Sequence, residues 1–527
     1  MLDILIKGGK IIDGSGNPWR YGDVGLVDGK IAALGTLGDA EAYRTIDATG
    51  LCVSPGFIDA HSHSDTTPLV NPRCESKIRQ GVTTECIGQC GASGAPRAAS
   101  AQDSGAPDDD EGDGLKPTWT TMAGYFEALA ARGHSVNLAP LVGHGNLRRL
   151  AMGYANRLAT PDELAKMKDL LRQGLEDGAL GFSSGLIYPP SAYCDTAELI
   201  ELAKVAAEYH GLYATHMRNE GDKLLDSVRE AITIGETAGV PTQISHHKAA
   251  GMPNWGKVKD SLRLIEEARA RGVDVTSDQY PYIASATGLR SIVPQAAHEG
   301  GPEKLLARLR DPSTRKELGA VVDRNHHTTT SWDKVYVSSV GTAKNKAAEG
   351  KNITEIAAMR GQPEWEAAFD LLIEEKLEVG MIRFGMCEED IAMVMRHPTT
   401  MPGSDGRCLA DYGPLSKGVP HPRNYGTFVR VLGKYVREDK VLTLEEAVKK
   451  MTSLPAGRYG LLDRGLLRTG LAGDVTIFDP ATVADRATFT QPHQYAAGVP
   501  YVIVNGAVVV DGGAHTGATP GKVLKRR

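Results

Sequence analysis

The fold and the site both depend on one stretch of the sequence, Gly56-Phe-Ile-Asp-Ala-His-Ser-His63. A mostly apolar run, Val53 to Ile58, leads into this stretch and is typical of a buried strand. Residues two apart on a strand share a face, so His61 and His63 point in the same direction. Two imidazoles at a strand end are a suitable pair of metal ligands. We therefore expect a metal site here, and not two incidental surface histidines.

Four later segments place a possible metal ligand after a short strand-like run. Each alone has an ordinary explanation, as a buried cysteine, a capped histidine or a turn aspartate. Together they indicate one site, because the C-terminal ends of successive strands in a parallel barrel meet on one face. Thiolate and imidazole are ligand types that suit zinc. The four candidates are Cys90 in Gly88-Gln-Cys-Gly91, His216 in Tyr213-Ala-Thr-His216, His246 in Gln243-Ile-Ser-His246 and Asp405 in Pro402-Gly-Ser-Asp-Gly406.

The chemistry of this set is that of a metal-dependent hydrolase. A cysteine sulfur can bridge two metal ions, and a zinc-bound water has its pKa lowered to about 7. Asp405 can take a proton from that water and pass it to a leaving amine. One ligand stays ambiguous on the residues alone. His246 and His247 are adjacent and point to opposite faces of a strand, so only one of them enters the site.

The pattern of strands and helices predicts an α/β fold. In the middle of the chain, strand-like runs alternate with amphipathic stretches over about 400 residues, which is typical of a parallel barrel. Both ends instead carry short strands with Asp-Gly or Asn-Gly turns, and these predict one small β domain. We therefore expect a catalytic barrel at 56–455, a β domain built from 1–55 and 456–527, and a helical insertion at 290–350 that acts as a lid.

Bulk composition narrows the class of function. Hydrophobic residues make up 41% and charged residues 24% of the chain, so a large core is possible. A net charge of −6 argues against a dedicated nucleic-acid binder, whose surface would be basic. No apolar run approaches about 18 residues and no signal peptide is recognisable, so we expect a soluble, cytoplasmic protein without membrane partners. The seven cysteines are then reduced thiols and not a disulfide framework.

The segment 100–114 interrupts the pattern with Ala, Ser, Gly and the acidic run Asp108-Asp-Asp-Glu111. Its composition predicts a flexible loop that connects two ordered parts of the chain. A calcium-binding loop is the weaker alternative, because no helix-loop-helix frame surrounds these acidic residues.

Taken together, the motifs resemble the amidohydrolase superfamily, and within it the D-aminoacylase (N-acyl-D-amino-acid deacylase) family, over nearly the whole chain. The resemblance implies a TIM-like (β/α)8 metallohydrolase barrel and a small β-sandwich made from both termini. It also implies zinc-dependent hydrolysis of N-acyl-D-amino acids to a carboxylate and a free D-amino acid. The motifs that carry it are Gly56-Phe-Ile-Asp-Ala-His-Ser-His63, Gly81-Val-Thr-Thr84, Gly88-Gln-Cys-Gly91, Gly143-His144, Gly178-Ala-Leu-Gly-Phe-Ser-Ser-Gly-Leu-Ile-Tyr-Pro-Pro190, Ile244-Ser-His-His-Lys248, Asp278-Gln-Tyr-Pro-Tyr282, Gly403-Ser-Asp-Gly406 and His421-Pro-Arg423.

The resemblance also implies a set of metal ligands. A tightly held Zn²⁺ is expected on Cys90, His216 and His246. A second, weaker metal position is expected near His61, His63, Cys90 and Asp405. Many amidohydrolases bridge two metals with a carboxylated lysine, but the strand around 180–184 has no lysine, so the bridging role falls to Cys90. The family pattern favours His246 over His247.

The same likeness predicts how the substrate is bound. Its α-carboxylate is expected to meet Lys248, Arg423 and a tyrosine of the pair Tyr280 and Tyr282. The fork of an arginine suits bidentate carboxylate binding, although a solvated lysine and a surface ion pair are the ordinary alternatives for these two cations. Tyr188 and His144 are further candidates, His144 through the substrate carbonyl or as support for a ligand. Arg290 either meets an acidic substrate side chain or forms a structural ion pair, the interpretation we favour.

Two other functions stay open on the sequence. One is a different amidohydrolase chemistry, on cyclic amides as in hydantoinases and dihydroorotases, or on peptides with D-residues. The missing lysine, together with Cys90, Lys248 and Arg423, argues against cyclic amides. The other is a barrel-shaped interaction protein without metals, which the presence of every expected ligand argues against. Side-chain and acyl preference, the number of metals in the active form and the oligomeric state do not follow from the sequence.

Overall fold

The computed structural model describes residues 1–99 and 115–526. The flexible loop and its calcium-binding alternative, both predicted for 100–114, lie outside the described residues. None of the described helices has the length and hydrophobicity that crossing a membrane requires.

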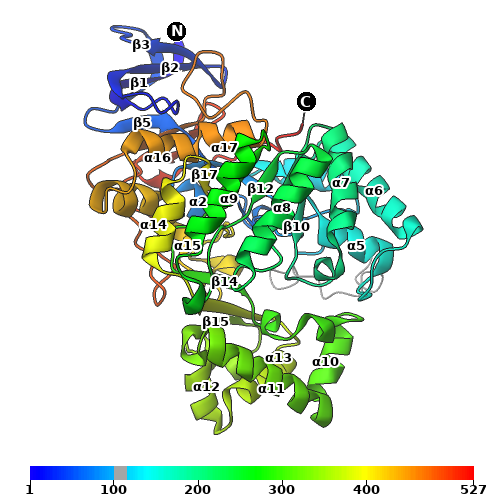
Figure 1. Cartoon of the computed structure of the whole chain (residues 1–527). Coiled ribbons are helices and arrows are strands. Elements are labelled where there is room, and N and C mark those ends of the chain that lie inside the picture. The colour runs from blue at the N-terminus through cyan, green and yellow to red at the C-terminus, as the bar shows by residue number, and fades with distance from the viewer. Residues whose placement is uncertain (100–114, 527) are drawn as a thin grey trace.

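A closed barrel of parallel strands forms the centre of the described structure (Figure 1). Six strands belong to one sheet and three to another, and β8 and β9 are two parts of one strand interrupted at Leu141. A parallel bridge between Ser62 and Gly406 joins the first strand to the last. The predicted TIM-like barrel is therefore confirmed. Its strands are β6 (Phe57–Asp59), β7 (Val82–Ile87), β8 (Asn137–Pro140) with β9 (Val142–Gly143), β10 (Gly181–Gly185), β11 (Leu212–His216), β12 (Thr242–Ile244), β13 (Val275–Gln279) and β17 (Thr400–Pro402).

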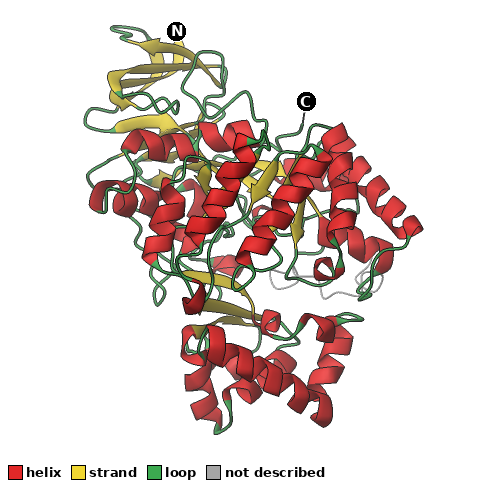
Figure 2. Cartoon of the chain, in the orientation of Figure 1, coloured by secondary structure: helices red, strands yellow, loops and turns green. Residues whose placement is uncertain are grey.

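Helices surround the barrel and connect its strands (Figure 2). The second helix after β9, α6 (Pro161–Glu176), illustrates why they form. Thr160 and Glu163 make a capping box at its N-terminus. Met167, Leu171 and Leu175 recur at helical spacing and form its buried face. The helices of the barrel are α4 (Met122–Arg132), α5 (His144–Met152), α6 (Pro161–Glu176), α7 (Thr196–Glu208), α8 (Leu224–Ala238), α9 (Val258–Ala270), α14 (Glu388–Arg396), α15 (Arg423–Arg430) and α16 (Leu444–Met451).

The two ends of the chain build one nine-stranded sheet beside the barrel. Its N-terminal and C-terminal parts meet where β5 pairs with β18, with Val475 opposite Pro55 in antiparallel register. Because β5 is followed directly by β6, this sheet anchors the strand that leads to His61 and His63. Its strands are β1 (Leu2–Ile11), β2 (Arg20–Val27), β3 (Lys30–Gly35), β4 (Ala42–Asp47), β5 (Cys52–Pro55), β18 (Val475–Phe478), β19 (Tyr501–Val504), β20 (Ala507–Asp511) and β21 (Ala514–His515).

The end of the chain returns from this sheet to the barrel. The amide of Leu138 on β8 donates to the carbonyl of Lys522, and the amide of Leu524 donates back to the carbonyl of Leu138. These contacts attach the last residues to the barrel, although the sequence assigns all of 456–527 to the β domain. We propose that the β domain consists of 1–55 and about 473–516, because these segments hold its strands.

Between β13 and β17 the chain forms a separate layer, which lies below the barrel in Figure 1. A three-stranded antiparallel sheet faces the barrel, and helices pack on it around a core that includes Leu305, Phe369 and Leu372. The layer spans 284–384, more than the insertion predicted at 290–350, because the sequence pattern there shows helices more clearly than short strands. Its main elements are β14 (Ala284–Gly288), α10 (Pro302–Arg310), α11 (Pro312–Thr329), β15 (Val335–Val340), α12 (Ile353–Arg360), α13 (Glu364–Glu374) and β16 (Val379–Phe384).

Candidate metal centre and active site

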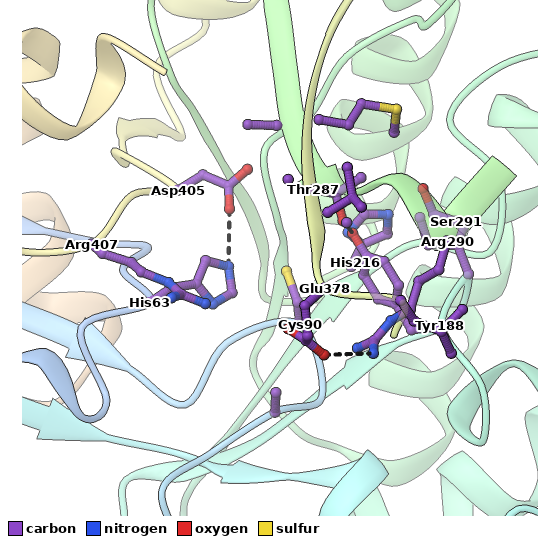
Figure 3. A pocket seen from close by; sticks show the side chains of 18 of the residues that line it. His63, Cys90, Tyr188, His216, Thr287, Arg290, Ser291, Glu378, Asp405 and Arg407 are labelled. Carbon is purple, nitrogen blue, oxygen red and sulfur yellow. Dashed lines mark hydrogen bonds and ion pairs between the residues drawn. The ribbon is translucent and has the colours of Figure 1, made fainter. Parts of the chain in front are cut away.

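A cavity of about 1170 Å³ lies between the C-terminal face of the barrel and the inserted layer. Barrel loops contribute Cys90, His216 and Asp405 to its lining, and the inserted layer contributes Arg290 and Glu378. Figure 3 shows these side chains around the same cavity. A substrate bound here would therefore be enclosed by both parts of the chain.

Three of the predicted ligands have left-handed backbone conformations, with φ of +53° at Cys90, +35° at His246 and +50° at Asp405. Residues other than glycine rarely adopt this region, and such strain is concentrated at functional sites. Each of the three lies shortly after a barrel strand, where the turn directs its side chain into the cavity. Backbone hydrogen bonds support these turns. The amide of His246 donates to Asp278 Oδ1 (2.7 Å), and that of Asp405 donates to the carbonyl of His61 (2.8 Å).

One group of possible ligands consists of Cys90, His216 and His246. Their donor atoms lie within 4.8 Å of one another, and Cys90 Sγ is 3.4 Å from His246 Nε2. Both ring nitrogens of His216 are buried and form no hydrogen bond within the described part of the chain. Burial of an unsatisfied polar group is costly, so a buried imidazole beside a thiol and a second imidazole fits the role of a metal ligand.

The second group consists of His61, His63, Cys90 and Asp405. Cys90 Sγ is 3.3 Å from His61 Nε2. Asp405 Oδ1 is 3.0 Å from His63 Nε2 and 3.5 Å from His61 Nε2. Cys90 belongs to both groups, so one sulfur is placed where it can serve two metal positions.

The electrostatics of Cys90 fit this role. Burial raises the pKa of its thiol, but the neighbouring His61 and His246 outweigh burial and hold the pKa well below its usual range. The side chain is therefore a thiolate, the form that binds metals. A thiolate surrounded by imidazoles is a donor set that fits zinc.

Beside the two groups, the predicted carboxylate-binding residues converge on one wall of the cavity. The ring of Tyr280 lies 4.9 Å from the Arg423 guanidinium and 5.5 Å from Lys248 Nζ. Each cation already has a carboxylate partner, since Lys248 contacts Glu220 at 2.5 Å and Arg423 contacts Asp405 at 2.6 Å. Both cations are buried, unlike the solvated lysine and surface ion pair that are their ordinary alternatives.

Comparison with known proteins identifies the family of the chain. The model of the amidohydrolase family matches residues 44–510. A D-aminoacylase of Alcaligenes xylosoxydans xylosoxydans is 40% identical over 525 residues, which cover 100% of this chain and 98% of the relative. The chain belongs to the D-aminoacylase family of amidohydrolases.

Two solved structures of similar proteins extend the comparison to the whole fold. The N-acyl-D-glutamate deacylase of Bordetella bronchiseptica, complexed with zinc and a phosphonate mimic of the tetrahedral intermediate, is 39% identical. It superposes with a TM-score of 0.85 over 99% of each chain. A D-aminoacylase with a binuclear metal centre, activated by one metal and attenuated by the second, is 37% identical with a TM-score of 0.84 over 100% of each chain.

The cyclic-amide alternative receives only distant support. L-hydantoinase from Arthrobacter aurescens covers the whole chain, but at 16% identity and a TM-score of 0.56. This likeness shows the fold alone.

Two further predicted substrate contacts of this D-aminoacylase-family chain line the cavity. Tyr188 Oη is 3.0 Å from Thr287 Oγ1 of the inserted layer, and its ring lies 5.0 Å from that of His216. Arg290 faces Glu378 at 3.9 Å, and both are partly exposed at the cavity surface (Figure 3). The ion pair favoured from the sequence is therefore present, and Arg290 lines the cavity.

Tyr282 and His144, also predicted as substrate contacts, are not part of the cavity lining. The chain turns at Pro281, with the amide of Tyr282 bonded to the carbonyl of Tyr280, so Tyr282 points away and packs near Phe489. His144 begins α5 as a buried side chain. Its ring nitrogens lie 3.1 Å from Ser191 Oγ and 2.8 Å from Glu198 Oε1, which leaves neither nitrogen for a substrate. Of the tyrosine pair, Tyr280 is therefore the one that lines the cavity, and His144 lies behind its wall. Their roles toward a substrate stay predictions.

His247, which the sequence left as an alternative to His246, has a structural contact. His247 Nε2 is 2.7 Å from Ser261 Oγ, on the side of β12 away from the metal groups, so His246 is the one that enters the cavity. Burial lowers the pKa of His247 to about 3, so its ring is neutral. On β7, close to Cys90 in sequence, Glu85 accepts hydrogen bonds from Ser62 and Ser64 and Cys86 is fully buried, so both residues have structural surroundings.

Three charged residues that sequence reasoning missed support the site. Asp278 Oδ1 lies 3.3 Å from His61 Nδ1, and Glu220 Oε1 lies 2.8 Å from His246 Nδ1. Lys77, fully buried, contacts Asp59 at 2.6 Å and Ser404 at 2.5 Å, next to Asp405. Asp278 lies within a quoted family motif, but nothing in the sequence around Glu220 or Lys77 distinguishes them from surface charges.

Proposed function

We propose that this protein hydrolyses the amide bond of N-acyl-D-amino acids with bound zinc, releasing a carboxylate and a free D-amino acid. The observation that carries the proposal is the wall formed by Lys248, Arg423 and Tyr280 directly beside the two possible metal groups. A site with buried cations next to a hydrolytic centre suits an amide whose product bears an α-carboxylate. The D configuration is supported by the D-aminoacylase of Alcaligenes xylosoxydans xylosoxydans and rests on that relationship.

The tight zinc would be held by Cys90, His216 and His246, and a second ion by His61, His63, Cys90 and Asp405. When bound, zinc supplies a water whose pKa is lowered to about 7 and polarises the scissile carbonyl. One tight and one weaker position accord with the related D-aminoacylase that one metal activates and a second attenuates.

Asp405 is proposed as the general base and general acid. Burial raises its pKa, but Arg423 and His246 outweigh burial and hold the pKa well below the usual range, so the residue starts as a carboxylate. In that form it accepts a proton from the attacking water at a carboxylate oxygen. It then gives the proton to the departing nitrogen, so that the amine leaves as a neutral group.

The other residues orient the substrate. Lys248 and Arg423 would bind the α-carboxylate, with the Tyr280 hydroxyl, which is buried and forms no hydrogen bond within the described residues, as a third donor. Tyr188 borders the cavity next to His216. Arg290 is placed to meet an acidic side chain of the substrate, which would favour acyl-D-glutamate or acyl-D-aspartate. The inserted layer covers this pocket on the side opposite the barrel and would reduce the contact of a bound substrate with bulk water.

The direct test is zinc content measured together with amine release from paired N-acetyl-D- and N-acetyl-L-amino acids with leucine, phenylalanine and glutamate side chains. We expect zinc in the purified protein and release from the D series alone. Preference for the glutamate derivative would assign Arg290 to the substrate side chain. Zinc without release from either series would contradict the proposal and favour cyclic amides or peptides with D-residues. A cytoplasmic location and the absence of nucleic-acid partners stay predictions.

A further inference from the structure

Glu220 joins the possible metal ligands to the carboxylate-binding wall. It lies in the loop after β11, lines the cavity and is largely buried. Its Oε1 is 2.8 Å from Nδ1 of His246 and 2.5 Å from Nζ of Lys248. Its Oε2 is 3.8 Å from Nε2 of His216. We propose that Glu220 is a positioning residue that orients His246 toward zinc and Lys248 toward the substrate carboxylate, an inference that rests on the proposed function.

The first part of this role concerns the tautomer of His246. Its Nε2 faces Cys90 Sγ at 3.4 Å, so Nε2 is the nitrogen on the metal side of the ring. Its Nδ1 faces the Glu220 carboxylate, which can only accept a hydrogen bond. Nδ1 therefore carries the proton and Nε2 keeps its lone pair for the metal. A carboxylate behind a ligating imidazole fixes the ring orientation and raises its basicity.

The second part concerns Lys248. Its Nζ lies 2.8 Å from Nδ1 of His246, so two hydrogen-bond donors meet at this point. Glu220 Oε1 is within hydrogen-bond distance of both Lys248 Nζ and His246 Nδ1. Because this carboxylate oxygen can accept from both donors, it stabilises their close approach. Without that negative charge, the buried ammonium would have to move away from the imidazole or compete for Nδ1. Either change displaces Lys248 from its place beside Tyr280.

The backbone makes Glu220 a rigid support. Its carbonyl accepts a 2.7 Å hydrogen bond from the amide of Ala250, which connects the loop after β11 to the loop after β12. The side chain of Asn219 accepts hydrogen bonds from the amides of Gly221 and Lys223 in the same loop. A residue that orients a ligand or a substrate group acts best when hydrogen bonds and packing fix its own position, as they do here.

The test compares wild-type protein with E220Q and E220D. The control is D222N, which removes an exposed carboxylate two positions further along the same loop. Zinc affinity is measured on metal-depleted protein by competition with a chromophoric chelator, and this measurement needs no substrate. Steady-state kinetics with N-acetyl-D-leucine then follow at saturating zinc. Thermal unfolding of each variant establishes that it is folded.

We expect E220Q to bind zinc about 10- to 100-fold more weakly than wild type. At saturating zinc its KM should rise more than its kcat falls, because Lys248 is displaced. E220D, which keeps the charge, should recover part of both losses, and D222N should behave as wild type. Folded E220Q with unchanged zinc affinity and unchanged KM would overturn the proposal. If E220Q does not fold, E220D alone decides the matter. Its carboxylate is one methylene closer to the backbone, so wild-type zinc affinity together with wild-type KM in E220D would overturn the proposal. A wild-type protein that binds zinc but hydrolyses no acylamino acid would contradict the proposed function, while the chelator titration would still decide the role of Glu220.

Discussion

Nη1 of Arg423 donates a 2.6 Å hydrogen bond to Oδ2 of Asp405. The residue proposed to bind the substrate carboxylate is thus also the partner of the residue proposed to transfer the proton. Nη2 of the same guanidinium donates to the carbonyl of Ala286 on β14 at 3.1 Å. Arg423 therefore connects the barrel loop, the proton-transfer group and the inserted layer, a relationship that the motif His421-Pro-Arg423 alone does not reveal.

The exchange R423A tests this relationship. Removing one partner of a buried, hydrogen-bonded charge pair costs about 2–5 kcal/mol, so kcat/KM for N-acyl-amino acids should fall at least about 30-fold. The loss should be larger on acylamino acids than on the matching amide without an α-carboxylate, and kinetics on the two substrates measure this difference. Equal losses would show that Arg423 acts only through Asp405.

For D405N, we expect bound zinc at the tight position and a kcat lowered by about 10²–10⁴-fold. The amide keeps the shape of the side chain but cannot accept the proton from water. Metal analysis and steady-state kinetics on the same preparation measure the two effects. A variant that retains wild-type kcat would exclude Asp405 as the proton-transfer group.

Because Cys90 belongs to both groups of possible metal ligands, we expect C90A to lose the tight zinc together with nearly all activity. The matched control is C86A, which removes another buried thiol, from β7 itself and away from the cavity lining. Metal content after dialysis distinguishes the two. Normal zinc and normal turnover in C90A would refute the bridging assignment.

The N-terminal cap of α6 should make the free energy of unfolding depend on pH. Hydrogen bonds from Arg157 and from the amide of Thr160 lower the pKa of Glu163 from 4.5 to about 2. Because the folded-state pKa lies below the unfolded one, this stabilisation is complete above pH 4.5 and is lost as the pH falls toward 2. E163Q should therefore lower the free energy of unfolding by about 1 kcal/mol at pH 7, a modest value because the pair is solvent-exposed.

Thermal unfolding of wild type and E163Q at pH 7 and at pH 3 checks this expectation. The difference in Tm should be smaller at pH 3. A difference that does not change with pH would mean that the charge of Glu163 contributes nothing to the cap.

Much of the fold is predictable from local pattern. Barrel strands followed by amphipathic helices have recognisable periodicity, and Thr160 with Glu163 marks a helix start in four residues of sequence. The extent of the inserted layer was underestimated, because β14, β15 and β16 pair only with one another across long separations. The return of the chain end to β8 was missed for the same reason, since Leu138 and Lys522 are distant in sequence.

The residues of the candidate site likewise include some that the sequence could predict and some that only folding brings into place. Tyr280 and Tyr282 look equivalent in sequence, yet the turn at Pro281 sends one ring into the cavity and the other away from it. Glu220 is an ordinary loop glutamate until folding places it against His246 and Lys248.

The sequence by itself determined which residue types are available to bind zinc and where along the chain they occur, because a ligand at a strand end is a local feature. Only the tertiary structure decided which carboxylates hold these ligands, as Glu220 does for His246 and Asp278 does for His61. The physical reason is that hydrogen bonds and ion pairs in the site join loops of different barrel strands. Their geometry is set by closure of the barrel, through contacts such as Ser62 with Gly406.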